Sequence, residues 1–165
     1  TTGELRVAGQ RLKVQGRAWL DHEWSSSLLD PQAVGWDWVG LNLDDGSALT
    51  VFRLRTADGQ SLFAGGSWRR PGQAVRPFEP HEVRMTPGRV WRSPATGAAY
   101  PVEWTLHTPA GVHAVRSVVD AQELDSRAST GTVYWEGLSR VSDEAGRRVG
   151  SGYLEMTGYA ARLSL

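Results

Sequence analysis

An alternation of apolar and polar residues recurs along almost the whole chain and is the feature that most constrains its fold. In residues 11–20, for example, small or apolar side chains occupy every second position. A period of two turns one side of a strand toward a core and the other toward solvent. Similar runs occur at 36–43, 48–55, 61–68, 81–85, 89–92, 100–107, 112–119, 132–141 and 152–160. The alternation therefore predicts a chain built almost entirely of β-strands.

Short turns containing glycine separate these predicted strands. They are Asp44-Asp45-Gly46, Asp58-Gly59, Pro109-Ala110-Gly111 and Glu144-Ala145-Gly146. Such turns join neighbouring antiparallel strands into hairpins. About ten hairpin-linked strands predict an all-β antiparallel barrel or sandwich. The best helix candidate is a short segment around 120–126, and 71–80 is predicted to be a surface loop.

Composition excludes several classes of protein. The 165 residues suit one domain, and the absence of cysteine excludes a disulfide scaffold and a cysteine nucleophile. The 18 basic residues balance 18 acidic ones, so we expect no nucleic-acid partner. There is no apolar run of about 18 residues that could span a membrane. The N-terminal residues lack the basic and apolar regions of a signal peptide.

Tryptophan is unusually frequent, with eight in the chain. Indole side chains are large and amphipathic, and clusters of them often line cavities for apolar ligands. There is no nucleophile elbow, phosphate loop, dinucleotide fingerprint or His-Glu-x-x-His motif. We therefore expect an apolar small-molecule ligand or substrate and no cofactor.

The densest candidate site is Trp19-Leu20-Asp21-His22-Glu23-Trp24. If the alternation of the preceding strand continues, His22 and Trp24 face the apolar side, and Asp21 faces the other side. A partly buried histidine beside a carboxylate can donate or accept a proton near neutral pH. The alternative is a core histidine that is hydrogen-bonded to backbone at the end of a strand.

The second candidate site is Gly35-Trp36-Asp37-Trp38. Asp37 shares a strand face with apolar residues, where a carboxylate needs a partner or a shifted pKa. It could be a buried acid between aromatic walls, or it could form a structural ion pair with Arg53. A three-residue hairpin loop would place Arg53 opposite Asp37. A two-residue Asp45-Gly46 turn would instead place Arg53 beside Trp38.

Two further sets of residues have weaker chemical potential. His107 and His113 flank a predicted three-residue loop that would set them opposite each other, but no third ligand is evident, so we expect no metal site. Near the C-terminus, Glu136 and Glu155 could meet across a strand ladder. They are interpreted either as a carboxylate pair or as ordinary strand-surface residues.

The motifs taken together resemble the carotenoid 1,2-hydratase (hydroxyneurosporene synthase) and AttH-like family. The resemblance rests on residues 16–24, Gly35-Trp36-Asp37-Trp38, Leu43-Asp44-Asp45-Gly46, residues 91–101, Tyr134-Trp135-Glu136-Gly137 and residues 152–159. It implies a lipocalin-like antiparallel β-barrel of about eight to ten strands. Members typically contain two such lobes, and residues 1–165 resemble the C-terminal one.

The resemblance also implies a function and a set of site residues. Better characterised relatives act on apolar, polyene-like substrates, and the hydratases add water to a double bond without a cofactor. Asp21, His22 and Asp37 match as catalytic groups. The matching substrate-binding residues are Trp24, Trp36, Trp38, Arg53 and Tyr134. Many members are described as secreted hydrolases, so export to the periplasm or medium is expected.

We therefore predict the C-terminal lobe of a hydratase-like enzyme that acts on a hydrophobic isoprenoid or alkene by acid catalysis. Its expected partner is its own N-terminal lobe or a second copy of the chain. The rival interpretations are a lipocalin-like module that binds an apolar small molecule without catalysis, and a packing lobe with no ligand. A carboxylate of Asp37 facing a cavity would favour chemistry, whereas a closed ion pair with Arg53 would favour structure.

Overall fold

A computed structural model describes residues 1–21 and 30–163, and most of these residues form β-strands. The predicted site residues His22 and Trp24 lie outside the described residues. The strands are β1 (Thr2–Val7), β2 (Gln10–Gln15), β3 (Gly35–Leu43), β4 (Ala48–Arg55), β5 (Ser61–Arg69), β6 (Arg76–Phe78), β7 (Arg84–Pro87), β8 (Val90–Arg92), β9 (Ala99–Pro101), β10 (Glu103–Thr108), β11 (Gly111–Ser117), β12 (Glu123–Ser126), β13 (Thr132–Asp143) and β14 (Arg148–Met156). The one helical element among the described residues is a 3-10 turn, η1 (Pro80–Glu82).

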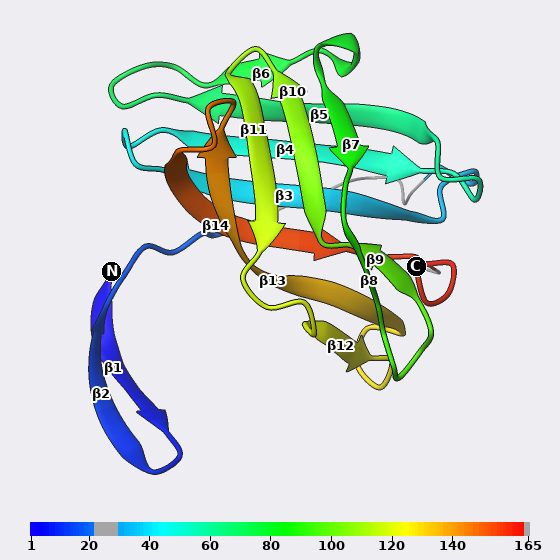
Figure 1. Cartoon of the computed structure of the whole chain (residues 1–165), viewed down its shortest axis with the longest axis horizontal. Helices are drawn as coiled ribbons and strands as arrows, with labels where there is room; N and C mark the ends of the chain where they lie inside the picture. The colour runs from blue at the N-terminus through cyan, green and yellow to red at the C-terminus, as the bar shows by residue number, and fades with distance from the viewer. Residues whose placement is uncertain (22–29, 164–165) are drawn as a thin grey trace.

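One ten-stranded antiparallel sheet forms the body of the protein. Its strand order is β6-β5-β4-β3-β14-β13-β11-β10-β7, and β12 pairs with β13. Figure 1 shows the sheet folding over, so that β7, β10 and β11 cross in front of β3, β4 and β5. The two faces that meet in this way enclose the core, and the opposite face looks outward.

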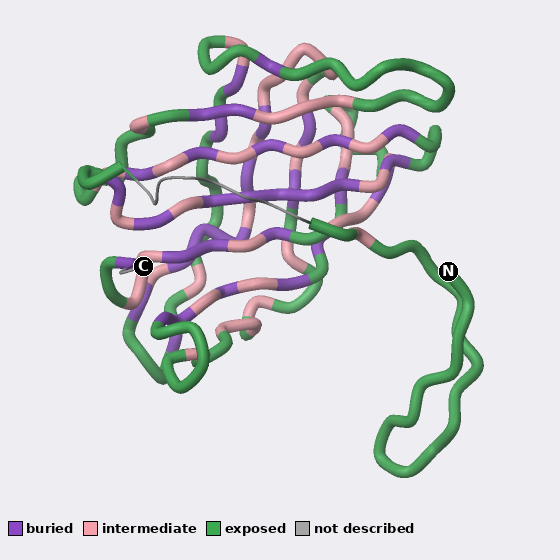
Figure 2. Tube along the Cα trace, turned by 180° about the vertical axis from the view of Figure 1, so that it is seen from behind, coloured by how far each residue is buried: buried purple, intermediate pink, exposed green. Residues whose placement is uncertain are grey.

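The register of β3 and β4 decides which residues face the core. Leu43 donates its backbone N–H to the carbonyl of Ser47 across a three-residue loop, with Gly46 in the left-handed region at φ +83°. This loop places Asp37 opposite Arg53, which is the first of the two registers that the sequence left open. Burial alternates residue by residue along β4, whereas most of β3 is buried on both faces. Figure 2 shows these burial classes along the chain.

The face that lines the core is called the inner face here, and the opposite one the outer face. Fully buried inner residues come from six neighbouring strands: Val39, Leu41, Leu49, Val51, Leu154, Met156, Trp135, Val115, Trp104 and Leu106. Burial of this much apolar surface is the main source of stability in such a sheet. The period-two pattern of the sequence thus corresponds directly to the two faces.

The all-β prediction is confirmed, but the sheet is open, whereas a closed barrel was expected. In the described chain, β6 and β7 are the two edges of the sheet and do not pair with each other. The segment that links them contains η1, and Pro80 lacks a backbone N–H with which to continue a ladder. The architecture is therefore a curled antiparallel sheet.

Several local predictions differ from the structure. Residues 120–126 contain β12 and no helix, because this segment hydrogen-bonds to the edge of β13. The strand predicted through residue 20 ends at Gln15, where the β1–β2 hairpin ends. The predicted surface loop 71–80 contains the short strand β6, which pairs with β5.

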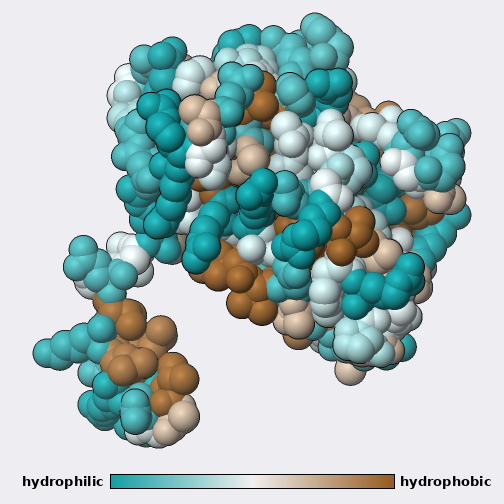
Figure 3. All heavy atoms as spheres, in the orientation of Figure 1, coloured by the Kyte–Doolittle hydropathy of each residue, from teal (hydrophilic) through white to brown (hydrophobic). Residues whose placement is uncertain are grey.

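The β1–β2 hairpin stands apart from the main sheet (Figures 1 and 3). Its two strands pair only with each other, and every residue in them is exposed. The exposed side chains include four large apolar ones: Leu5, Val7, Leu12 and Val14. Within the described residues, no helix is long and apolar enough to cross a membrane.

Candidate functional site

The three consecutive residues Trp36, Asp37 and Trp38 point to opposite faces of β3. Asp37 lies on the inner face and is 0% exposed, whereas the two tryptophans lie on the outer face. The motif therefore contributes to two separate environments. One is a buried ionic cluster, and the other is an aromatic surface.

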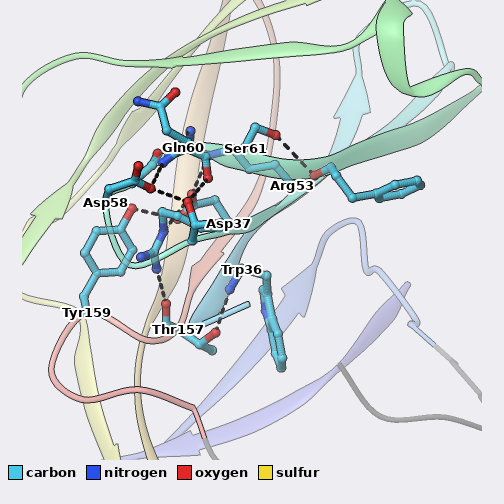
Figure 4. A network of polar contacts seen from close by, with 12 residues as sticks. Trp36, Asp37, Arg53, Asp58, Gln60, Ser61, Thr157 and Tyr159 are labelled. Atoms are coloured by element: carbon cyan, nitrogen blue, oxygen red, sulfur yellow. Dashed lines mark hydrogen bonds and ion pairs between the residues drawn. The ribbon is translucent and has the colours of Figure 1, made fainter. Parts of the chain in front are cut away.

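The inner cluster consists of Asp37, Arg53, Arg55 and Tyr159, and Figure 4 labels Asp37, Arg53 and Tyr159. Arg53 donates from Nε to Oδ2 of Asp37 at 2.7 Å, and Nε of Arg55 lies 3.4 Å from the same oxygen. The hydroxyl of Tyr159 donates to Oδ1 of Asp37 at 2.8 Å. Both carboxylate oxygens are thus occupied, and no part of the side chain reaches solvent.

Glycines let the C-terminal loop bring Tyr159 to Asp37. Gly158 has φ +76°, and a Cβ there would lie 2.1 Å from the carbonyl oxygen of Val34. A Cβ on Gly35 would lie 2.3 Å from the carbonyl oxygen of Thr157. The loop packs directly on the start of β3, and Nη2 of Arg55 donates to the Thr157 carbonyl at 2.5 Å.

Aromatic rings cover the two guanidinium groups of the inner cluster. The guanidinium carbon of Arg55 lies 3.9 Å from the ring centroid of Tyr159, and that of Arg53 lies 4.8 Å from the centroid of Trp104. Burial, together with the charge of Asp37, raises the pKa of Tyr159, so its hydroxyl remains a donor. The cluster is a closed, buried network that ties β3, β4 and the C-terminal loop together.

A second polar cluster surrounds Glu123 and was not predicted from the sequence. Its carboxylate accepts hydrogen bonds from the hydroxyls of Ser93, Thr96 and Tyr100. Burial raises the pKa of Glu123, but these hydrogen bonds outweigh it and leave the pKa below its ordinary value. The Tyr100 ring lies 5.2 Å from that of Tyr159, centroid to centroid, which connects this cluster to the inner one.

On the outer face, the rings of Trp19 and Trp38 pack over Gly40 of β3. The rings of Trp19 and Trp38 meet edge to face, with their centroids 5.9 Å apart. A Cβ on Gly40 would lie 2.4 Å from the Trp38 ring and 2.7 Å from the Trp19 ring. The glycine therefore makes room for both indoles.

A row of directly paired residues crosses the outer face. It runs from Glu136 on β13 to Glu155 on β14, then to Trp38 on β3 and Phe52 on β4. These four residues are called the outer row. Beside it, the indole Nε1 of Trp36 donates to Oε1 of Glu155 at 2.7 Å.

The two carboxylates of the outer row occupy an unusual position. Directly opposed residues on antiparallel strands have Cβ atoms about 5 Å apart, so Glu136 and Glu155 are close enough to interact. Both are half-buried, and burial raises the pKa of Glu136. Burial and the charges of both glutamates also raise the pKa of the neighbouring Tyr153.

Two pockets open beside Trp19 on this face. One of about 310 Å³ is lined by Ala18, Trp19, Leu20, Asn42, Ala48, Thr50, Ser67, Arg69 and Val75. The other, of about 240 Å³, is lined by Arg17, Ala18, Trp19, Gly40, Asn42, Leu138, Ser151, Gly152 and Tyr153. The second pocket shares Tyr153 with the surroundings of the two glutamates.

Among the predicted site residues that the structure describes, some lie on the inner face and others on the outer face. Asp21 is exposed and follows the outer-face Trp19, and Tyr134 is half-buried on the outer face of β13. Asp37 and Arg53 lie inside. The alternation of the sequence already indicated that Asp37 and its flanking tryptophans are on opposite faces, but Arg55, Tyr159 and Glu123 could not be placed without the tertiary fold.

His107 and His113 are not opposite each other. The turn between β10 and β11 has two central residues, so His113 pairs with Leu106 and the two imidazoles lie on opposite faces. Burial lowers the pKa of His113. Among the described residues, no group of three or more histidine, aspartate or glutamate side chains could hold a metal ion.

Comparisons with known proteins place the chain in a family. The AttH-like family matches residues 1–159. The structure is similar to that of an AttH protein from Nitrosomonas europaea, with a TM-score of 0.90 and 45% identity, covering 96% of this chain and 49% of that one. It also shares its fold with kievitone hydratase from Nectria haematococca, with a TM-score of 0.68 and 17% identity, covering 97% of this chain and 50% of that one.

This chain thus spans about half the length of each of these two proteins. A search of curated proteins gave no match. The family match extends over nearly the whole sequence and is independent of any single motif. The chain belongs to the AttH-like family.

Proposed function

We propose that this chain is the C-terminal lobe of a cofactor-independent hydratase-like enzyme that acts on a hydrophobic alkene or isoprenoid. Family membership and the fold shared with a hydratase support the class of reaction. The proposed substrate site is on the outer face. There, three tryptophans and two glutamates lie on the same face as two pockets that Trp19 lines.

The proposed chemistry is the addition of water to a carbon–carbon double bond. A carboxylic acid or imidazolium protonates one carbon, indole faces stabilise the carbocation, and water then attacks it. The roles predicted for Asp21, His22 and Asp37 stay predictions. The contacts of Asp37 support its structural role, because each of its oxygens already has a donor.

The test uses the complete product of the gene that encodes this chain, incubated in ¹⁸O-labelled water. The probes are kievitone and squalene, which represent a phenolic and an acyclic alkene substrate. We expect an alcohol product that carries one ¹⁸O atom. Failure to hydrate either probe would overturn the proposed reaction for this substrate class. Equal turnover by His22→Ala and Asp37→Asn variants would overturn the predicted roles of both residues.

A second candidate function is binding of an apolar molecule without catalysis. The closed ion pair of Asp37 with Arg53 favours this alternative, because a carboxylate held in such a pair is not available to protonate a substrate. Under this alternative, all-trans-retinol quenches tryptophan fluorescence with saturable binding, and the labelled-water assay gives no alcohol. The two experiments together separate a binding lobe from an enzyme.

We propose that the partner of this lobe is another lobe of the same fold in the same parent chain. Both similar structures are about twice as long as the region that they share with this chain. The exposed apolar side chains of the β1–β2 hairpin offer a surface for such a lobe. Amide hydrogen exchange in Leu5–Val7 should slow in the complete gene product relative to this chain alone. Equal exchange rates would contradict the proposal.

Export to the periplasm or medium is also a proposal, supported by the family resemblance alone. Fractionation of the native organism tests it, with the protein expected outside the cytoplasm. Recovery of the protein only with cytoplasmic markers would contradict it.

A further inference from the structure

We propose that Glu136 and Glu155 form the acid pair of the outer face, with Glu136 as the proton donor to the substrate. This inference rests on the proposed function and names the groups that carry out its chemistry. Both residues lie in stretches that carry the family resemblance, but neither is among the site residues that the resemblance implies. The proposal is supported by the strand register, by the burial of the two residues and by a hydrogen bond from a neighbouring indole.

The first argument is position. Glu136 and Glu155 are direct partners on adjacent strands, and the next partner in the row is Trp38. Glu155 therefore lies between Glu136 and Trp38, and the acid pair shares one surface with an indole. An indole near the acid pair can stabilise the positive charge of a carbocation that the acid generates.

The second argument is that the two carboxyl groups have different surroundings. Trp36 donates a 2.7 Å hydrogen bond to Glu155, and such a bond favours the ionised form of the acceptor. Glu136 is half-buried, and burial favours its neutral form. These surroundings favour a proton on Glu136.

The third argument is access to a substrate. The charges of both glutamates raise the pKa of Tyr153, and Tyr153 also lines the pocket of about 240 Å³ beside Trp19. The other apolar groups of that pocket include Leu138, which is 52% exposed and lies on the same face of β13 as Glu136. An apolar chain lying over this pocket would reach the acid pair along the outer face.

The step balances in atoms and electrons. The π-electron pair of the alkene forms a new C–H bond with the Glu136 proton, and the O–H bond breaks to leave a carboxylate. A water oxygen donates a lone pair to the resulting carbocation, and Glu155 takes the proton that this water loses. Transfer of that proton from Glu155 to its neighbour Glu136 restores the starting state.

The experiment compares Glu136→Gln and Glu155→Gln in the complete gene product, with Glu144→Gln as a matched control on an exposed turn. The assay is the hydration of kievitone and squalene in ¹⁸O-labelled water. Loss of a general acid lowers turnover by about 10²–10⁴-fold. We expect this loss for Glu136→Gln, a smaller loss for Glu155→Gln, and unchanged turnover for Glu144→Gln.

A second measurement does not depend on the substrate. Carboxyl carbons of the protein labelled with ¹³C-glutamate are titrated by NMR, and Glu136 is assigned by its absence in Glu136→Gln. A pKa of Glu136 above the ordinary range for glutamate supports the pair, and an ordinary value overturns it. Full turnover by Glu136→Gln overturns the acid assignment and leaves the proposed function standing. Failure of the wild-type protein to hydrate any probe overturns the proposed function itself.

Discussion

The inner cluster and the outer row contain similar chemical groups in opposite situations. In the inner cluster, the carboxylate of Asp37 is 0% exposed and its oxygens accept from Arg53 and Tyr159. In the outer row, two half-buried carboxylates oppose each other beside tryptophans and a pocket. A saturated buried carboxylate holds a fold together, whereas a carboxylate pair at an accessible aromatic surface can exchange protons. The comparison supports a structural role for the inner face, and we propose that the chemistry takes place on the outer face.

The largest expected effect is on stability, from Asp37→Asn. This change leaves two buried guanidinium groups without their counter-ion, which costs about 3–5 kcal/mol in comparable buried pairs. Urea unfolding measures the loss, with the exposed Asp21→Asn as the control, expected within about 0.5 kcal/mol of wild type. An Asp37→Asn protein of normal stability but without activity would reverse the assignment of this face.

A smaller loss is expected from Tyr159→Phe, which removes one hydrogen bond to the same carboxylate. Hydrogen bonds to charged groups contribute about 1.5–3 kcal/mol. Tyr153→Phe, on the outer face, removes the hydroxyl of an exposed side chain and is expected to change stability by less than about 0.5 kcal/mol. Equal losses for the two variants in thermal unfolding would show that the faces do not differ as described.

Gly40→Ala tests the aromatic surface of the outer row. The added methyl group would collide with the rings of Trp19 and Trp38, so we expect a cost of about 1–3 kcal/mol from overpacking. The displaced indoles should also weaken retinol binding, measured by fluorescence quenching. Gly3→Ala is the control, because a Cβ there meets nothing within 4 Å. If Gly40→Ala bound retinol with wild-type affinity, the rings of Trp19 and Trp38 would not be part of the binding surface.

The smallest effect concerns pH. The pKa of Glu123 is lower in the folded protein than its ordinary value of 4.5, so its contribution to stability is present above that value. The contribution is lost as the pH falls through the folded-state pKa. Unfolding measured between pH 3 and pH 6 should therefore show a shallower acid decline for Glu123→Gln than for wild type. Identical declines would contradict the network around Glu123.

Much of the fold could be predicted from the sequence, because successive side chains of a strand point to opposite faces of the sheet. A period of two in side-chain polarity therefore indicates one buried face and one exposed face. The pattern over 36–43 and 48–55 corresponds to β3 and β4, and the Gly46 turn accounts for the pairing of Asp37 with Arg53. Failure to close into a barrel could not be predicted. It depends on whether the two edge strands, β6 and β7, pair with each other, and the polarity pattern of a strand does not reveal which strands are its neighbours.

The site was harder to predict than the fold, because its contacts join residues distant in sequence. Asp37 and Tyr159 are 122 positions apart, and Trp36 and Glu155 are 119 apart. Glu136 and Glu155 were placed as possible ladder partners, and that pairing is confirmed. The role that we propose for them depends on burial and on the Trp36 indole, neither of which the local pattern reveals.

The tryptophans themselves offer the most direct test of the central claim that ligands bind to the outer face. Each indole N–H gives its own signal in an ¹H–¹⁵N NMR spectrum, and these signals are recorded during titration with all-trans-retinol. We predict that the signals of Trp19, Trp36 and Trp38 shift, while those of the buried Trp104 and Trp135 stay in place. Shifts at Trp104 and Trp135 without shifts at the three outer-face tryptophans would contradict the account.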